Sequence, residues 1–293
     1  MSYLPCELRC CVSNGDVSQT LCNARDDHLA AVALFGGCAN DEILPVVKGD
    51  VIEYGRFAVT ALGSAAKCDE TLTVDEAVSA VKAFGGAAGV SLIGDAGKSD
   101  LRNWRNVDFL EIWHGAFSFY NSYNDKAFAL WNSLLDEGYH IACTYARDTD
   151  DEQVEDAHYG CTYVDIDGEV DSSTIIRGIR MGKTVASTGA KLFFRVHQRG
   201  NTYSIGETLK NGNAVFSFFT DLHSREKNAG DEEVEYKLIR VITNGGEEVL
   251  CVDVRERHIS LNLKKKHWYR AELWGRVNGI NKILAVTSPI YTA

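Results

Sequence analysis

The feature that most constrains the fold of this chain is a change in hydrophobic periodicity close to residue 190. Before that point, short apolar runs of strand length, such as residues 30–35 and 87–94, alternate with amphipathic segments of helical period. After it the helical period disappears, and short β-rich runs are separated by Gly and Asn turns. The sequence therefore predicts an α/β domain with a largely parallel sheet or barrel at residues 1–190, followed by a β-sandwich domain at residues 191–293.

Several segments of the first part are typical of helices. The clearest spans residues 72–86, where Thr73 and Glu76 have the spacing of a capping box and two glycines follow the apolar stripe. That stripe consists of Ala77, Val78, Val81 and Phe84. Residues 122–139 and 172–183 predict two further helices, and the polar residues 16–29 are compatible with a fourth.

The balance of charge narrows the range of partners. The chain has 30 Lys and Arg against 41 Asp and Glu, a formal net charge of -11, which opposes attraction to nucleic acids and to anionic lipid surfaces. The first residues lack the regions of a signal peptide, and no apolar run approaches the roughly 20 residues that span a bilayer. We therefore expect a cytoplasmic protein whose partners include neither nucleic acid nor a membrane.

The cysteines give no sign of a covalent or metal-bound framework. There are nine of them, scattered along the chain without a CxxC pair. An odd number without paired spacing argues against a disulfide scaffold and against a zinc finger. We expect reduced and mostly buried thiols.

The segment 7–15, with the sequence ELRCCVSNG, predicts a strand that ends in a turn. A strand places residues i and i+2 on one face, so Arg9 and Cys11 are expected to face the same pocket. The segment resembles the first strand of the PHP (polymerase and histidinol phosphatase) family of metal-dependent phosphoesterases, in its carbaryl-hydrolase-like branch. That family has Glu-Leu-His-x-His-Thr followed by Ser-Asp-Gly. Here Arg9 and Cys11 stand at the two His positions, and Asn14 replaces the Asp.

Other motifs occur in the family's order, so the resemblance covers nearly the whole chain. The family's Thr-Asp-His falls at residues 35–37, where the sequence is Phe-Gly-Gly. Its Gly-His falls at Gly55 and Arg56, and its His-Pro turn matches Gly94 and Asp95. At each of these positions the residue that binds metal in the family is absent.

Two later motifs keep part of the family pattern. The FLEIWHG segment retains the carboxylate as Glu111 and has His114 where the family often has Asn. The terminal Ser-Asp-x-His motif is best matched by residues 147–150, which include Arg147, Asp148 and Asp150.

The resemblance implies a distorted β/α barrel with a C-terminal β-sandwich, and a strand-end site where divalent ions activate water for phosphoester hydrolysis. Of the ligands of such a site only Glu111 and Asp148 remain, and Cys11 is the only replacement suited to a soft metal. Arginine cannot replace a ligand, because its guanidinium stays protonated and offers no lone pair. We therefore expect no metal cofactor. The alternative is a single zinc or manganese ion held by Cys11, Glu111 and Asp148.

Three hypotheses describe what occupies the pocket instead. In the first, the arginines pair with Glu111 and Asp148, so that no charge is buried alone. In the second, Arg9 and Arg56 bind a small anion such as phosphate or a carboxylate without turning it over. In the third, catalysis persists, either with one metal or by general acid–base chemistry of Glu111, Asp148 or Asp150.

The residues favour a degenerate protein of the PHP type that has lost metal-dependent hydrolysis. We expect a non-catalytic anion-binding, regulatory or assembly protein, with no catalytic residue identified. The alternative is a metal-dependent phosphoester or ester hydrolase with a rebuilt site. The candidate pocket consists of the remnant metal-site positions Arg9, Cys11, Asn14, Arg56, Asp95, Glu111, His114, Arg147, Asp148 and Asp150.

Overall fold

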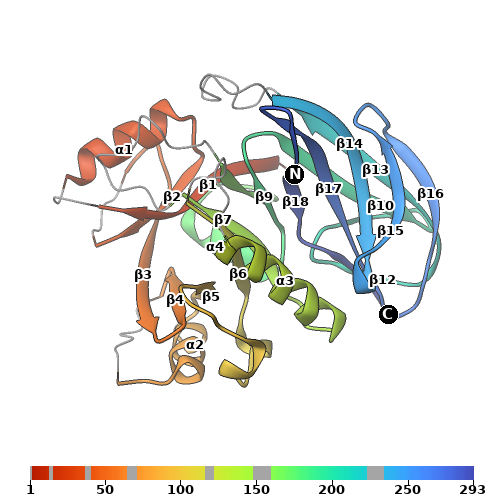
Figure 1. Cartoon of the computed structure of the whole chain (residues 1–293). Coiled ribbons are helices and arrows are strands. Elements are labelled where there is room, and N and C mark those ends of the chain that lie inside the picture. The colour runs from red at the N-terminus through yellow and green to blue at the C-terminus, as the bar shows by residue number, and fades with distance from the viewer. Residues whose placement is uncertain are drawn as a thin grey trace.

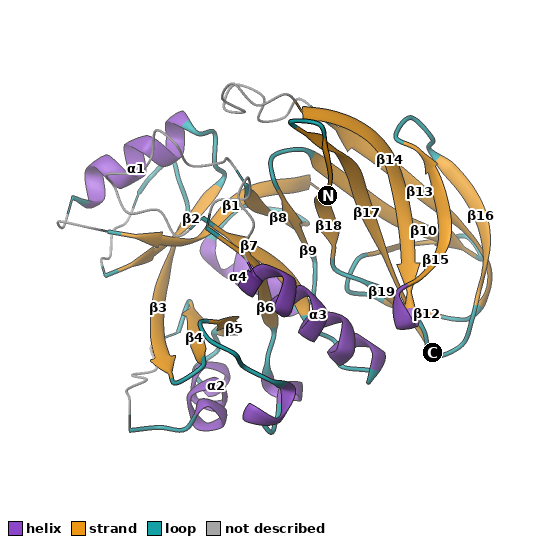
Figure 2. Cartoon of the chain, viewed as in Figure 1, coloured by secondary structure: helices purple, strands orange, loops and turns teal. Residues whose placement is uncertain are grey.

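The computed structural model describes residues 2–12, 16–36, 41–64, 71–115, 122–147, 160–222 and 234–293, and of Cys11 only the backbone. Strands dominate this part of the chain (Figure 2). They form one mixed sheet of 15 strands and a second sheet of four strands. Figure 1 shows the first strands and the helices on one side of the molecule and the strands after residue 190 on the other.

The first seven strands follow one another in the large sheet in chain order. The first three strands run parallel to one another, and the last three also run parallel to one another. The fourth strand is antiparallel to the third and to the fifth. The strands are β1 (Ser2–Cys11), β2 (Ala31–Phe35), β3 (Val46–Tyr54), β4 (Phe57–Leu62), β5 (Ala87–Leu92), β6 (Phe109–His114) and β7 (Ala142–Ala146).

The described residues contain α1 (Val17–Asp26), α2 (Val74–Ala83), α3 (Ser122–Asp136) and α4 (Ser172–Arg180). The capping box predicted for α2 is confirmed, because Thr73 and Glu76 exchange the two expected hydrogen bonds. Of the apolar stripe, Ala77, Val78 and Val81 are buried, whereas Phe84 is the C-cap residue of the helix and is 63% exposed. None of these helices has both the length and the apolar character needed to cross a lipid bilayer.

The predicted fold class, an α/β protein with a distorted PHP-type β/α barrel and a C-terminal β-sandwich, is wrong. The sheet is mixed, few helices accompany its many strands, and no closed barrel forms in the described ranges. One physical reason is that Tyr54 and Phe57 pair across the two-residue loop Gly55–Arg56. Gly55 adopts a φ of +65°, and residues 46–62 form a hairpin where a barrel needs a helical crossover.

A second reason is that the two strands that follow β7 in the chain run antiparallel to their neighbours. β8 (Cys161–Ile166) runs antiparallel to β1, and β9 (Thr184–Ser187) runs antiparallel to β8. Apolar runs of strand length do not specify their direction, so the sequence pattern could not reveal this arrangement.

Side-chain hydroxyls, rather than another strand, satisfy the outer edge of β7. The N–H of Cys143 donates to Ser288 Oγ at 3.0 Å, and its C=O accepts from Thr184 Oγ1 at 2.6 Å. Two residues further, Thr162 Oγ1 accepts from the N–H of Tyr145 and donates to its C=O, both at 2.9 Å. We call Thr162, Thr184 and Ser288 the hydroxyl seam. All three are buried, so they supply partners that water cannot provide there.

The large sheet continues across residue 190, because β9 pairs with β18 (Ile280–Thr287). The domain boundary predicted there stays a prediction. The other strands of the large sheet are β12 (Thr208–Leu209), β14 (Val234–Thr243), β15 (Glu247–Asp253), β17 (Trp268–Val277) and β19 (Ile290–Thr292). The second sheet consists of β10 (Lys191–Gln198), β11 (Asn201–Ser204), β13 (Gly212–Asp221) and β16 (His258–Leu263). The two sheets share a core, in which the rings of Phe216 and Tyr269 lie 5.9 Å apart.

A buried arginine connects α3 to the C-terminal strands. Arg270 of β17 donates to Glu272 Oε1 from Nε at 2.9 Å and from Nη2 at 2.7 Å, and to Asn132 of α3. Its guanidinium also lies within 5.2 Å of the ring centroids of Phe128, Trp131 and Trp268. Since the charge is paired and covered by aromatic faces, it fixes α3 against the sheet.

Replacing Ser288 with Ala tests the hydroxyl seam. The N–H of Cys143 then loses its buried partner, so the free energy of unfolding should fall by about 1–3 kcal/mol. Chemical denaturation measures the change, and S260A, at an exposed position of β16, is the matched control with an expected change within about 0.5 kcal/mol. Equal stability of the two variants would contradict this role of the seam.

Candidate functional site

The ends of β1 and β6 bring Arg9, Glu111 and His114 together. Arg9 Nη1 lies 3.6 Å from Glu111 Oε1, and the same carboxylate oxygen lies 2.5 Å from His114 Nδ1. Arg9 and Glu111 are buried, whereas the side chain of His114 remains 34% exposed. β1 and β6 are far apart in the order of the sheet, so this contact results from the curl of the sheet.

Irregularities in both strands determine which side chains meet. The pairing of β6 with β7 shifts register between Glu111 and Trp113. A regular strand would direct residues i and i+3 to opposite faces, but the extra residue places Glu111 and His114 on the same side. In β1 the register with β2 shifts between Glu7 and Cys10, close to Arg9. These bulges cannot be read from alternating hydrophobicity.

A second group of ion pairs, centred on Arg147, lies beside the contact between Arg9 and Glu111. Glu7 is buried and accepts from the N–H of Arg9 at 3.0 Å, from the N–H of Arg147 at 3.3 Å, and from Arg147 Nε at 2.9 Å. Arg147 Nη1 lies 2.8 Å from Asp27 Oδ2. The shared partner Glu7 therefore links Arg147 to the backbone of Arg9.

Burial and neighbouring charges shift the pKa values of Glu7 and Arg147. Burial raises the pKa of Glu7 above its ordinary value, although Arg147 opposes this shift. For Arg147, burial lowers the pKa, but the carboxylates of Glu7 and Asp27 outweigh this effect and hold the pKa above its usual value. The guanidinium is thus a permanent charge that compensates two carboxylates.

Arg56 and Asp95 form a separate, exposed group. Arg56 Nη1 donates to the backbone O of Asp95 at 3.0 Å and lies 3.7 Å from Asp100 Oδ2. The carboxylate of Asp95 pairs with Lys126, whose hydrogen bond and charge lower the pKa of Asp95. The side chains of Arg56 and Asp95 are 63% and 79% exposed. Within the described residues no hydrogen bond or ion pair joins this group to Arg9 or Glu111.

The structure does not describe the side chains of the other four residues of the predicted pocket. Asn14, Asp148 and Asp150 lie outside the described residues, and Cys11 contributes only its backbone, at the end of β1. The sequence prediction also omitted Glu7 and Asp27 from the pocket. Glu7 carried a signal, because a carboxylate within an apolar strand requires a partner. Asp27, at the end of α1, carried none.

The described donors do not fit a metal ion. No group of three or more His, Cys, Asp or Glu side chains that could hold a metal occurs in the described ranges. Glu111 is engaged by Arg9 and His114, and Glu7 is engaged by Arg147. A guanidinium has no lone pair for a cation and repels it. The arrangement can instead present a guanidinium and an imidazole, held by one carboxylate, to an anion or to a proton donor.

No protein-family model matches this chain, and no curated protein sequence matches it significantly. The resemblance to the PHP family thus depends on the order of short motifs.

Replacing Arg147 with Met tests whether it compensates Glu7. The variant leaves a buried carboxylate without its cation, so the free energy of unfolding at neutral pH should fall by about 3–5 kcal/mol. The double variant E7Q/R147M should recover part of this loss, because neither residue 7 nor residue 147 then carries a buried charge. Guanidinium denaturation measures both, with R255M at an exposed position as the control.

The free energy of unfolding of R147M and of E7Q/R147M should also depend on pH in different ways. Because the pKa of Glu7 is raised on folding, its contribution to stability is fully present below its ordinary pKa of 4.5 and is lost as the pH rises through the folded pKa. Removal of Arg147 raises that pKa further, so R147M should lose stability more steeply above pH 4.5 than the parent protein does. A parallel pH profile for R147M and E7Q/R147M would refute the pairing.

Proposed function

We propose that this protein is a metal-independent binding protein for a small anion, either phosphate or a carboxylate, at the ends of β1 and β6. In the same proposal it is a degenerate relative of the PHP phosphoesterases that does not perform their metal-dependent hydrolysis. The observation that carries the proposal is the placement of Arg9 and His114 on one oxygen of Glu111. Metal-dependent phosphoester hydrolysis would need metal ligands at these positions.

Charge supports an anion more than a cation at this place. Arg9 brings a permanent positive charge, and the imidazole of His114 offers a polar edge that is partly exposed. The nearby carboxylates already have partners, since Glu111 contacts both groups and Glu7 pairs with Arg147. Glu111 accepts the proton on Nδ1 of His114, so the other ring nitrogen donates to an oxyanion only when the ring is an imidazolium. In that form the oxyanion would receive charge-assisted hydrogen bonds in a partly desolvated setting, where they are strong.

The first experiment is elemental analysis of protein purified without chelator and without a metal-affinity tag, together with hydrolysis assays on a generic phosphodiester and an aryl ester. We expect substoichiometric metal and no turnover. Stoichiometric zinc, manganese or iron, lost together with activity in E111A, would overturn the proposal and establish a rebuilt metallohydrolase.

Anion binding is tested by calorimetric titration with inorganic phosphate and with acetate. R9M should weaken binding by about 10- to 100-fold, the loss expected for one charge-assisted hydrogen bond. R9K should retain part of the affinity, and R56M, which removes an exposed guanidinium from the separate group, should leave it unchanged. Because Arg9 is buried, H114N provides a second variant whose partly exposed side chain is less coupled to folding. Equal affinity in the parent protein, R9M and H114N would contradict the proposed site.

A further inference from the structure

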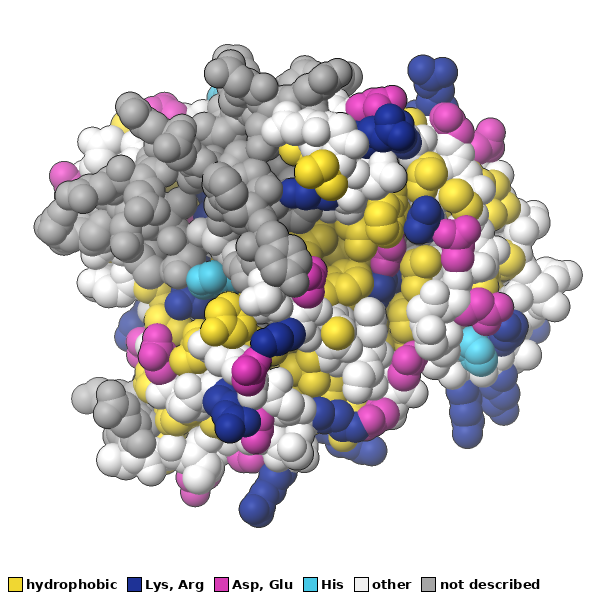
Figure 3. All heavy atoms as spheres, in the orientation of Figure 1, with side chains coloured by type: hydrophobic (Ala, Val, Ile, Leu, Met, Phe, Trp, Pro, Cys, Tyr) yellow, Lys and Arg dark blue, Asp and Glu magenta, His cyan; other side chains and the backbone are white. Residues whose placement is uncertain are grey.

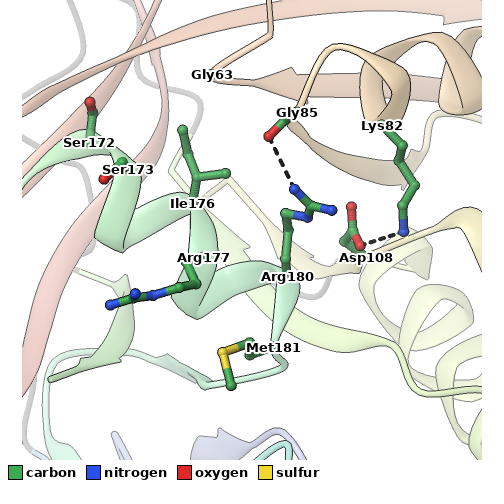
Figure 4. Close-up of a pocket in the computed structure, with 10 residues that line it drawn as sticks. All are labelled: Gly63, Lys82, Gly85, Asp108, Ser172, Ser173, Ile176, Arg177, Arg180 and Met181. Atoms are coloured by element: carbon green, nitrogen blue, oxygen red, sulfur yellow. Dashed lines mark hydrogen bonds and ion pairs between the residues drawn. The ribbon is translucent and has the colours of Figure 1, made fainter.

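A cleft of about 670 Å³ lies near the start of β6, whereas Arg9 and His114 meet Glu111 further along this strand. Asp108, which immediately precedes β6, lies in its wall, whereas Glu111 and His114 lie further along that strand. The other wall is α4, and Figure 4 shows the side chains of Ile176, Arg177 and Arg180 projecting from this helix. Asp108 and Glu111 are three residues apart along the chain, and His114 lies at the far end of β6 from Asp108.

The cleft contains more positive than negative charge. Its lining includes the cations Lys82, Arg177 and Arg180, and the single carboxylate Asp108. Asp108 is already compensated, because it accepts from Lys82 Nζ at 2.8 Å and from the N–H of Ala88 at 2.9 Å. On the face drawn in Figure 3, by contrast, Lys and Arg side chains lie among Asp and Glu side chains. A local excess of positive charge in a chain of net charge -11 favours a specific anion at this place.

Arg180 has the geometry to bind that anion. Its Nη1 donates to the backbone O of Gly85 at 3.2 Å, which fixes the guanidinium across the cleft (Figure 4). A guanidinium has five N–H donors, so one such bond leaves capacity for a bidentate contact with an oxyanion. In the part of the chain that the structure describes, no carboxylate forms an ion pair with Arg180 or Arg177.

Ile176 forms an apolar part of the cleft wall that is fixed by close packing. Ile176 points toward Gly63 (Figure 4), and a Cβ at Gly63 would come within 2.0 Å of Ile176 Cδ1. Gly63 also has a φ of +66°, so a larger residue there would be strained as well as crowded. The side chain of Arg180 extends from α4 toward Gly85, and that of Arg177 extends in a different direction (Figure 4). The helix spacing i, i+3 keeps the bases of the two arginines about 5–6 Å apart.

We propose that this cleft is a second anion site, which binds a small molecule with two linked phosphate groups. One phosphate binds Arg180 and Lys82, the other binds Arg177, and the body of the ligand lies over Ile176. Two phosphates joined in one molecule bind better than two separate ions, because the second contact is intramolecular. The site is independent of the anion site proposed at Arg9.

The test is calorimetric titration of the full chain with pyrophosphate and with inorganic phosphate. The parent protein should bind pyrophosphate more tightly than phosphate, and R180M and R177M should each weaken pyrophosphate binding about tenfold or more. R180K should recover part of the affinity, because it keeps the charge but not the bidentate geometry. R255M, which removes an exposed arginine elsewhere, should bind as the parent does.

Both arginines also lie in the last turn of α4, where basic residues offset the helix macrodipole. Thermal unfolding without ligand therefore accompanies each titration, and only a loss of affinity in variants that remain folded supports the site. Unchanged pyrophosphate affinity in both R180M and R177M overturns the proposal. Pyrophosphate binding that is lost in R9M but retained in R180M would also overturn it, because the anion would then lie at the other end of the strands.

Discussion

The backbone groups along the outer edge of β7 form the constraint on which the rest of the structure depends. Their N–H groups at residues 143, 145 and 147 each donate to a side chain, and the acceptors are Ser288, Thr162 and Glu7. Buried backbone groups must have partners, and here three segments that are distant in sequence provide them. β7 therefore holds β1, β8 and the residues after β18 in place, and the sheet curls around it without a closing ladder.

The candidate site continues this row of contacts. Glu7 accepts from the backbone N–H of Arg147 and from its guanidinium, so one carboxylate both satisfies the strand edge and neutralises a buried charge. It also accepts from the N–H of Arg9, and thereby helps to set where the Arg9 side chain meets Glu111. In a buried network each member stabilises the others, and the removal of one member leaves an uncompensated charge. Fold and site are consequently a single interaction system in this region.

The sequence predicted the local elements better than their arrangement. The capping box of α2 and the apolar runs of β2 and β5 depend on neighbouring residues, so they could be recognised from the chain alone. The hairpin of β3 and β4 and the antiparallel direction of β8 depend on long-range pairing, and here the barrel expected from motif order was wrong. Within the site, Arg9 and Glu111 were expected in one pocket from their places in motifs, and the structure brings them to 3.6 Å from each other. The roles of Asp27 and of the bulge in β6 could not be predicted, because they arise only when distant strands meet.

The two groups of cations differ in how their charge can act. At the ends of β1 and β6, Arg9 is buried against Glu111, so any ligand must fit an existing hydrogen-bond geometry in a medium of low dielectric. In the α4 cleft, Arg177 and Arg180 are exposed and no described carboxylate pairs with them, so their attraction is long-ranged and is screened by salt. If both proposed sites bind anions, the buried group would select an anion by its shape, whereas the cleft would select by charge and by the spacing of two charges. Because the chain has a net charge of -11, anions can be attracted only where positive charge is locally in excess. The two groups of cations lie toward opposite ends of β6.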